Sequence, residues 1–167
     1  MEHLWAPWRA EYFAHQKPNG CFFCHAASQK DNQGETSSDD ANQLLIRDRT
    51  CFAMLNAYPY NVGHLMVSPY RHTGNLEDLT GDELKDMMIL ARRCKQILQD
   101  ALKADGFNLG LNVGSASGGG VTDHLHLHVV PRWNGDANFM TVLSDIRVVP
   151  EGLKQTFEKL KQQIANV

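Results

Sequence analysis

Three histidines alternate with apolar residues in the segment 122–133, which reads TDHLHLHVVPRW. Successive side chains of a β-strand point to opposite faces, so His124, His126 and His128 are expected to share one face, about 7 Å apart from one to the next. The other face carries the apolar residues that anchor the strand in the core, Leu125, Leu127 and Val129. The pattern predicts a strand held rigidly on one side that presents imidazoles on the other, which is what a catalytic site needs.

Three interpretations of this histidine row are open: exposed histidines without function, a metal site, and a face that handles phosphate. A site in which all three bind one ion is excluded by distance, because the outer two residues lie about 13 Å apart and ligand nitrogens lie about 2 Å from the metal. At most one or two of them can share a metal. Histidine also serves as nucleophile, acid, base or cationic donor. The preceding residues 114–123, GSASGGGVTD, supply small residues whose N–H groups can approach phosphate closely. Strict alternation after a triple glycine favours the phosphate interpretation.

The rest of the chain has the composition of a globular protein. Its 167 residues are 43% hydrophobic and 21% charged, which suits one domain spanning residues 1–167. The net charge of −3 gives no basic field for duplex nucleic acid. The start, MEHLWAPWRAEYF, lacks a basic segment followed by an apolar one, and no apolar run approaches the roughly 20 residues that span a bilayer. These features predict a cytoplasmic protein without a nucleic-acid or membrane partner.

Short strand-like runs dominate the expected secondary structure. Five such runs are expected, at residues 42–48, 51–57, 63–69, 107–114 and 124–131. In the fourth run the alternation is expected to turn four side chains inward, those of Phe107, Leu109, Leu111 and Val113. Most links are short, and one long helix separates the third run from the fourth. The expected fold class is therefore α+β, with a mainly antiparallel sheet.

The long helix is expected from Thr80 to about Ala104. Thr80 is a suitable N-cap, and acidic residues follow it in the first turn, where the helix dipole favours them. One buried face at three-four spacing is expected to contain Leu84, Met87, Met88, Ala91, Cys94, Ile97, Leu98, Ala101 and Leu102. A terminal helix is expected over Glu151–Ala165. Residues 1–20 are expected to form an N-terminal arm, and the polar residues 28–41 an exposed loop.

Four cysteines fall into two groups. Cys51 and Cys94 lie in apolar surroundings and are expected to pack as small hydrophobic residues. Cys21 and Cys24 form the motif CFFCH, which has three interpretations: haem attachment, a redox dithiol, or half of a zinc site. Haem attachment requires export, and a redox dithiol requires a thioredoxin-like βαβ context, neither of which is expected here. The zinc interpretation, with two distant histidines completing a tetrahedral set, is favoured.

The alternating histidines resemble the motif of the histidine triad family of nucleotide hydrolases and transferases. The resemblance rests on residues 124–130, HLHLHVV, and extends to PYNVGHLMVSPYRH at 59–72, CFFC at 21–24 and PRWNGDANF at 131–139. The Trp-rich start and VVPRWNGDANF are most similar to the bacterial branch that includes diadenosine tetraphosphate phosphorylases and hydrolases. The resemblance implies a histidine triad fold with one long and one C-terminal helix, and a homodimer with a continuous sheet.

The resemblance also implies roles for individual residues. His126 would be the nucleophile that attacks the α-phosphate and forms a covalent nucleotidyl-histidine. His128 and the glycine-loop amides would stabilise the phosphoryl oxygens, and His64 would support the site from a neighbouring strand, unless it is a purely structural histidine. The implied substrate-binding positions, besides His128, are Asn56, Asn112, Gly119, Gly120, Val121, Thr122 and Trp133, with plain packing as the alternative for Trp133. The implied ligands of one structural zinc per chain are Cys21, Cys24, His72 and His124.

The expected function is cleavage of a phosphoanhydride in a dinucleoside polyphosphate such as diadenosine tetraphosphate, without an organic cofactor. A phosphorylase, a nucleoside phosphoramidase and a non-catalytic nucleotide-binding module remain as alternatives. In phosphorylase-like members a hydroxyl residue is expected just after the glycine that matches Gly119, whereas Gly120 stands there in this chain. The choice between water and phosphate as acceptor is therefore open.

Overall fold

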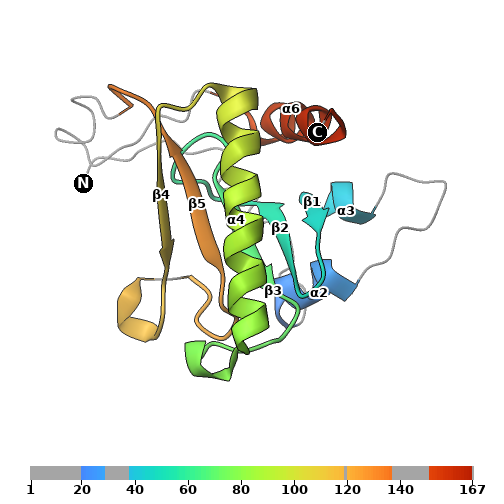
Figure 1. The fold of residues 1–167 in the computed structure, drawn as a ribbon, viewed down its shortest axis with the longest axis vertical. Coiled ribbons are helices and arrows are strands. Elements are labelled where there is room, and N and C mark those ends of the chain that lie inside the picture. Colours follow the sequence, from blue (N-terminus) through green and yellow to red (C-terminus); the bar gives the residue numbers. More distant parts are fainter. Residues whose placement is uncertain (1–19, 29–37, 119, 137–150, 167) are drawn as a thin grey trace, which may run out of the picture.

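The computed structural model describes residues 20–28, 38–118, 120–136 and 151–166 (Figure 1). The described strands are β1 (Leu44–Arg47), β2 (Cys51–Leu55), β3 (Leu65–Pro69), β4 (Gly106–Leu111) and β5 (Leu127–Arg132). The described helices are α2 (Phe22–Ser28), α3 (Ser38–Ala41), α4 (Gly81–Leu102) and α6 (Leu153–Ala165), together with the 3₁₀ turns η1 (Leu76–Asp78) and η2 (Ser115–Ser117).

The described strands form one five-stranded sheet in the order β1-β2-β3-β5-β4. Every neighbouring pair is antiparallel. The α+β class, the antiparallel sheet, the long helix and the C-terminal helix are thus confirmed. β5 lies between β3 and β4, so the histidine segment that leads into it enters the middle of the sheet.

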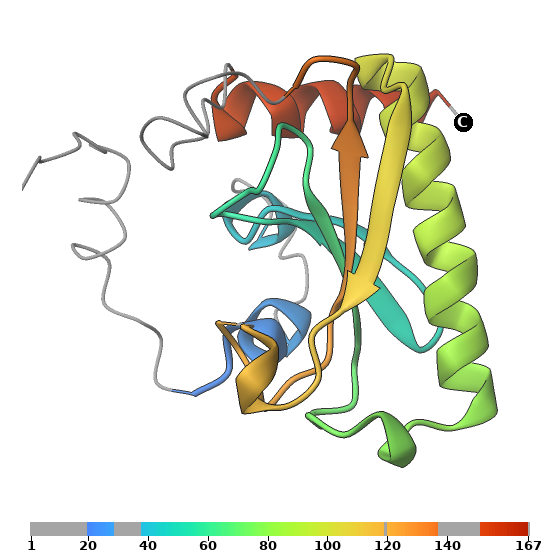
Figure 2. The same cartoon turned by 90° about the vertical axis from the view of Figure 1, so that its left-hand side faces the viewer.

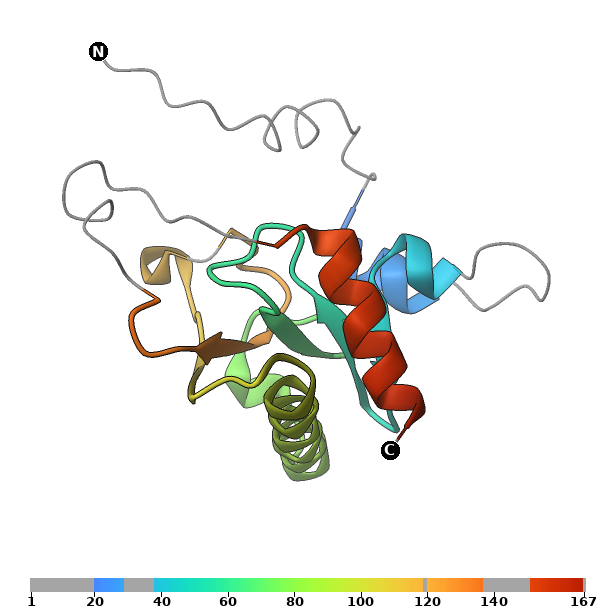
Figure 3. The ribbon, with the colours of Figure 1, turned by 90° about the horizontal axis from the view of Figure 1, so that it is seen from above.

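Helices cover both faces of the sheet. α4 packs on one face, and α6 lies against both α4 and β1 (Figure 3). α2 and the turn η2 lie on the other side of the sheet from α4 (Figure 2). β2 alternates between two apolar clusters: Ala53 and Leu55 face the large core under α4 and α6, whereas Phe52 and Met54 face a smaller core with Phe23 of α2. A strand covered on both faces reads as a continuous apolar run, which explains the sequence CFAML.

The start of α4 is fixed by a capping box. The Thr80 hydroxyl accepts from the Glu83 N–H, and the Glu83 carboxylate accepts from the Thr80 N–H. At the other end Lys103 takes the left-handed conformation, with φ of 54°, and ends the helix. The predicted N-cap is confirmed. Cys51 and Cys94 are fully buried, which confirms their assignment to the core.

The prediction of burial was wrong for several apolar side chains of β4, of the segment after it and of α4. Leu109 and Val113 are 45% and 46% exposed, and Leu111 is exposed as well. Leu84 and Met88 of α4 are also exposed, Met88 by 56%. Periodicity identifies the side of an element that carries apolar residues. It does not show whether another element covers that side, and β4 is an edge strand of the sheet. The neighbouring Met87 is buried, as predicted.

Two predicted boundaries also differ. β5 begins at Leu127 rather than at His124, so the first part of the histidine segment precedes the strand. The predicted loop 28–41 ends in the short helix α3, and its residues 29–37, like most of the predicted arm 1–20, lie outside the described residues. Among the helices that the structure describes, none has the length and apolar character to span a bilayer.

Candidate active site and metal cluster

The histidine segment is held by side chains and loops before it enters the sheet. The Leu125 N–H donates to the Thr73 carbonyl over 2.8 Å, and the buried Ser68 hydroxyl donates to the Leu125 carbonyl over 2.9 Å. The Leu125 side chain is 2% exposed and packs in the large core. These contacts replace the strand hydrogen bonds that the sequence predicted here. The buried positions of Leu125, Leu127 and Val129 are confirmed.

The hydrogen bonding of His126 determines which of its nitrogens can react. Its Nδ1 lies 2.9 Å from the backbone oxygen of His124. Because a carbonyl oxygen only accepts, Nδ1 carries the hydrogen and Nε2 keeps its lone pair in the neutral ring. Burial lowers the pKa of His126, which favours this neutral form. Nε2 has no hydrogen-bond partner within the part of the chain that the structure describes, so its lone pair is available to an electrophile.

His64 and His128 form a second hydrogen-bonded pair, of fixed direction. The Tyr60 N–H donates to His64 Nδ1 over 3.1 Å, so this nitrogen is an acceptor. In the neutral ring the hydrogen must then sit on His64 Nε2, which lies 2.8 Å from His128 Nδ1 and donates to it. His128 consequently carries its hydrogen on Nε2. That nitrogen lies 3.2 Å from Nδ2 of Asn112, and because both atoms carry hydrogens, the Asn112 amide must turn its oxygen toward His128 to accept.

Burial keeps both members of this pair uncharged near neutral pH. It lowers the pKa of His64, which is fully buried, to about 3, with further lowering by the charges of His128 and His126. Burial, followed by the charge of His126, lowers the pKa of His128 to about 4. The face therefore offers neutral imidazoles in defined tautomers, which is the state in which one ring can attack and another can donate.

A cavity of about 280 Å³ opens beside His128. Its walls are formed by residues 108–112, which belong to β4 and the position after it, by the turn η2 and by the loop before His64. Its lining residues are Tyr60, Asn108, Leu109, Gly110, Leu111, Asn112, Ser117, Gly118, His128 and Val130. The His126 ring lies next to it, with its centroid 4.7 Å from that of His128. The sequence indicated His128 and Asn112 here, but it gave no signal for Tyr60 or Asn108, which reach the cavity from other segments.

The remaining predicted binding residues lie in different places. The Asn56 amide donates to His64 Nδ1 over 3.3 Å instead of lining the cavity. Gly119 lies outside the described residues. Gly120 and Thr122 are exposed, and Val121 packs against the smaller core. Trp133 donates from its indole N–H to the carbonyls at the end of α4 and lines a different cavity, of about 640 Å³.

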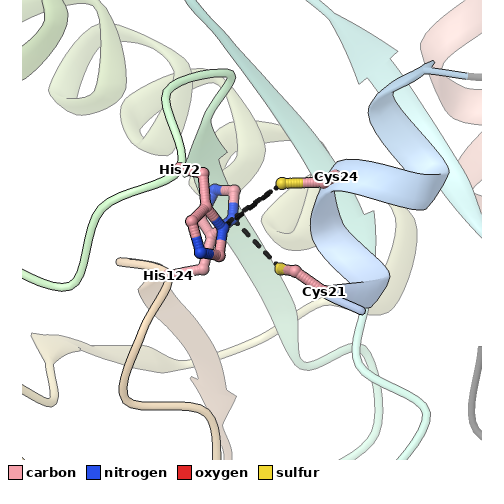
Figure 4. A group of neighbouring side chains, drawn as sticks. All are labelled: Cys21, Cys24, His72 and His124. Atoms are coloured by element: carbon pink, nitrogen blue, oxygen red, sulfur yellow. Dashed lines mark hydrogen bonds between the residues drawn. The ribbon is translucent and has the colours of Figure 1, made fainter. Parts of the chain in front are cut away.

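The Cys/His cluster consists of Cys21, Cys24, His72 and His124 (Figure 4). Its four ligand atoms all lie within 4.8 Å of one another. They come from α2 and the residue that precedes it, from the loop after β3 and from the segment before β5. The Nδ1 atoms of the two histidines are 3.2 Å apart, and the sulfur of Cys24 lies 3.3 Å from Nδ1 of His72. The structure thus brings together all four residues that the sequence indicated.

The chemistry of this donor set fits a metal ion. In a tetrahedral site with bonds of about 2.0–2.3 Å, ligand atoms lie about 3.3–3.8 Å from one another, close to the separations found here. The Nε2 atom of His124 lies 2.9 Å from the Pro69 carbonyl and therefore carries the hydrogen, which leaves Nδ1 as a lone pair. Burial and the neighbouring Cys21 raise the pKa of the Cys24 thiol, and a bound cation reverses such an effect. The cluster can therefore bind a metal.

Comparison with known proteins finds relatives named as a phosphorylase and a tetraphosphatase. A protein of Mycobacterium tuberculosis named AP-4-A phosphorylase is 39% identical over 160 residues, which cover 93% of this chain and 80% of the relative. A Schizosaccharomyces pombe protein named asymmetrical bis(5'-nucleosyl)-tetraphosphatase is 32% identical over 95 residues, which cover 57% of this chain and 52% of that protein.

A solved structure has the same fold and is described as containing zinc. The zinc-bound histidine triad family protein of Mycobacterium smegmatis superposes with a TM-score of 0.66 and is 28% identical, covering 87% of this chain and 94% of that one. Residues 37–135 match the family described as the HIT domain, which is more than half of the chain. The chain therefore belongs to the HIT domain family.

Proposed function

We propose that this protein is an enzyme that cleaves dinucleoside polyphosphates through a covalent nucleotidyl intermediate on His126. The observation that carries the proposal is the hydrogen bond from His126 Nδ1 to the His124 carbonyl. Because Nδ1 carries the hydrogen, the lone pair of the ring remains on Nε2. Relatives named as a phosphorylase and a tetraphosphatase of such compounds support the substrate class.

The chemistry consists of two displacements at one phosphorus atom. His126 Nε2 forms a bond to the α-phosphorus, and the bond from phosphorus to the bridging oxygen breaks, releasing the remaining polyphosphate. An acceptor oxygen then attacks the same phosphorus and releases the imidazole. Asn112 and the Nε2–H of His128 lie where they can donate to the phosphoryl oxygens, and such fixed donors favour a developing charge.

Phosphate is the second candidate acceptor, beside water. The relative named AP-4-A phosphorylase matches 93% of this chain, which favours phosphate. Gly120, in a position where phosphorylase-like members are expected to carry a hydroxyl residue, favours water. Nucleoside phosphoramidase activity uses the same intermediate and is the further alternative.

The test is incubation of the wild-type protein and His126→Ala with diadenosine tetraphosphate, with and without phosphate. Wild type is expected to consume the substrate and His126→Ala to be inert. With attack on the α-phosphate, ADP together with ATP in the presence of phosphate means phosphorolysis, whereas AMP together with ATP means hydrolysis. Equal activity of the two proteins contradicts the role of His126. Nucleotide binding by an inert wild type would instead identify a binding module.

The metal of the Cys/His cluster is proposed to be zinc, one ion per chain. Two thiolates and two imidazoles form a common structural zinc set with no open position. The zinc-bound relative from Mycobacterium smegmatis supports this choice. The proposed zinc site requires both thiols to stay reduced. Because the cytoplasm is a reducing compartment, we propose that the protein is cytoplasmic.

We further propose a homodimer formed through β4. Leu109 and Leu111 pair with Val129 and Leu127 of β5, so they share the α4 face of the sheet, yet they are exposed. β1, at the other end of the sheet, packs against α3 and α6. Pairing of β4 with the same strand of a second copy would extend the sheet and cover these leucines.

A further inference from the structure

Phe23 is a fully buried aromatic residue that contacts two of the three histidines. Its ring centroid lies 5.0 Å from that of His126 and 5.1 Å from that of His124, tilted by 34° and 44°. It belongs to the smaller core, with Phe52 and Met66. Nothing in the proposed reaction uses Phe23, although it lies against the ring to which the nucleophilic role is given.

The place of Phe23 in the sequence joins it to the metal cluster. In the sequence it lies between Cys21, which directly precedes α2, and Cys24, which lies within α2, so two members of the cluster flank it. The cluster reaches His126 by a second route as well. The His124 side chain belongs to the cluster, while its backbone oxygen accepts the hydrogen bond from His126 Nδ1.

One hydrogen bond cannot fix the orientation of an imidazole ring, because the ring can still swing about it. Contacts on the ring itself are needed to direct Nε2. The described residues provide two aromatic neighbours: Phe23 at 5.0 Å, and the edge-on ring of His128 at 4.7 Å, with an interplanar angle of 77°. The His128 ring is held in turn by His64. Phe23 is therefore the neighbour that does not belong to the triad.

We propose that Phe23 is a positioning residue for His126, and that the Cys/His cluster orients the nucleophile through it. The ring of Phe23 supports the imidazole, and the ligands on either side of it keep α2 in place. The proposal rests on the proposed nucleophilic role of His126. A reacting group that is misplaced by about 1 Å can lose about 10²-fold in rate, so removing this ring is expected to affect the chemical step.

The test compares Phe23→Leu with Phe157→Leu. Phe157 is a matched control because it is 4% exposed and belongs to the large core on α6, a helix that packs against α4 and β1. Both variants lose a buried ring and are expected to melt at a lower temperature. With diadenosine tetraphosphate, Phe23→Leu is expected to lose between about tenfold and 10²-fold in kcat with little change in KM, because the transition state is misaligned and binding is not. Phe157→Leu is expected to retain the wild-type kcat at a temperature at which it is folded.

The second readout is the ¹⁵N spectrum of the His126 ring, which does not depend on activity. Wild type is expected to show one sharp signal from a protonated nitrogen and one from an unprotonated nitrogen, and Phe23→Leu to show both signals broadened because the ring swings about its hydrogen bond. Chelation of the metal is expected to cause the same broadening in wild type and a smaller further change in Phe23→Leu, in which only the His124 backbone still joins the cluster to His126. Where Phe23→Leu does not fold, Phe23→Met retains most of the volume and is the variant to use.

Three results would overturn the inference. One is a Phe23 variant with wild-type kcat and a wild-type His126 spectrum. Another is an equal loss of kcat in the Phe23 and Phe157 variants, because it would reflect general destabilisation. The third is a His126 spectrum in wild type that chelation leaves unchanged. An inactive wild type with the predicted spectral changes would reject the proposed function and leave the positioning role supported.

Discussion

Acidification is expected to destabilise the protein through His128. Burial and the charge of His126 lower the pKa of His128 in the folded protein to about 4, whereas an unfolded histidine titrates near 6.5. Between these values the unfolded chain binds a proton that the folded chain does not. The contribution of His128 to stability is therefore fully present above about pH 6.5 and is lost as the pH falls toward 4.

The magnitude follows from the two pKa values. They differ by about 2.5, which corresponds to about 3.4 kcal/mol at about 1.36 kcal/mol for each unit. Because the loss is spread over the whole interval, about 2 kcal/mol of it is expected between pH 7 and pH 5. His128 is only 8% exposed, so solvent screening does little to reduce this effect.

The assay is urea unfolding of wild type and His128→Gln at pH 7, 6 and 5. Glutamine can accept from His64 and donate to Asn112, but it does not titrate. Wild type is expected to lose about 2 kcal/mol more than the variant between pH 7 and pH 5. The Cys/His cluster is the same in both proteins, so the effect of acid on it cancels in the comparison. Equal pH dependence of wild type and His128→Gln would refute the reasoning.

Three further perturbations test the metal cluster, the dimer and the support of the histidine segment. Cys24→Ser is expected to lose zinc in elemental analysis and to melt at a lower temperature; full retention of zinc would contradict the proposed ligand set. Leu109→Glu, on β4, is expected to give a monomer in light scattering, whereas Ile89→Glu, at an exposed position of α4, leaves the dimer intact; equal behaviour of the two would exclude this surface. A Cβ atom at Gly74 would lie 2.2 Å from the Thr122 carbonyl oxygen, so Gly74→Ala is expected to displace the backbone next to His124 and cost on the order of 1–3 kcal/mol in urea unfolding. An unchanged unfolding midpoint would show that this contact is readily relieved.

Local patterns predicted the elements whose cause is local. Thr80 caps α4 because a hydroxyl residue three positions before an acidic one satisfies the first helical N–H groups. Alternation placed Leu125, Leu127 and Val129 in the core, although β5 begins only at Leu127. The Cys-x-x-Cys spacing and the family resemblance together indicated a cluster whose members lie up to 103 positions apart.

Contacts between distant segments left no comparable signal. Tyr60 reaches the cavity because its loop folds back over His64. Phe23 reaches His126 because α2 lies on the face of the sheet opposite α4 (Figure 2). Neither residue type is unusual in a core. Met88 and Leu109 were expected to be buried because periodicity reports which side of an element is apolar. Whether a neighbouring element covers that side depends on the tertiary arrangement.

The three histidines of the triad follow one rule in three different surroundings. In each ring one nitrogen is fixed by a structural partner: the Pro69 carbonyl for His124, the His124 carbonyl for His126, and the His64 ring for His128. The partner decides which nitrogen carries the hydrogen, and thereby which nitrogen remains for chemistry. In the proposed function this leaves Nδ1 of His124 for the proposed metal, Nε2 of His126 for the attack on phosphorus, and the Nε2–H of His128 for a phosphoryl oxygen. Three identical side chains can therefore take three roles because the backbone and one neighbouring ring, rather than the imidazole itself, select the reactive atom.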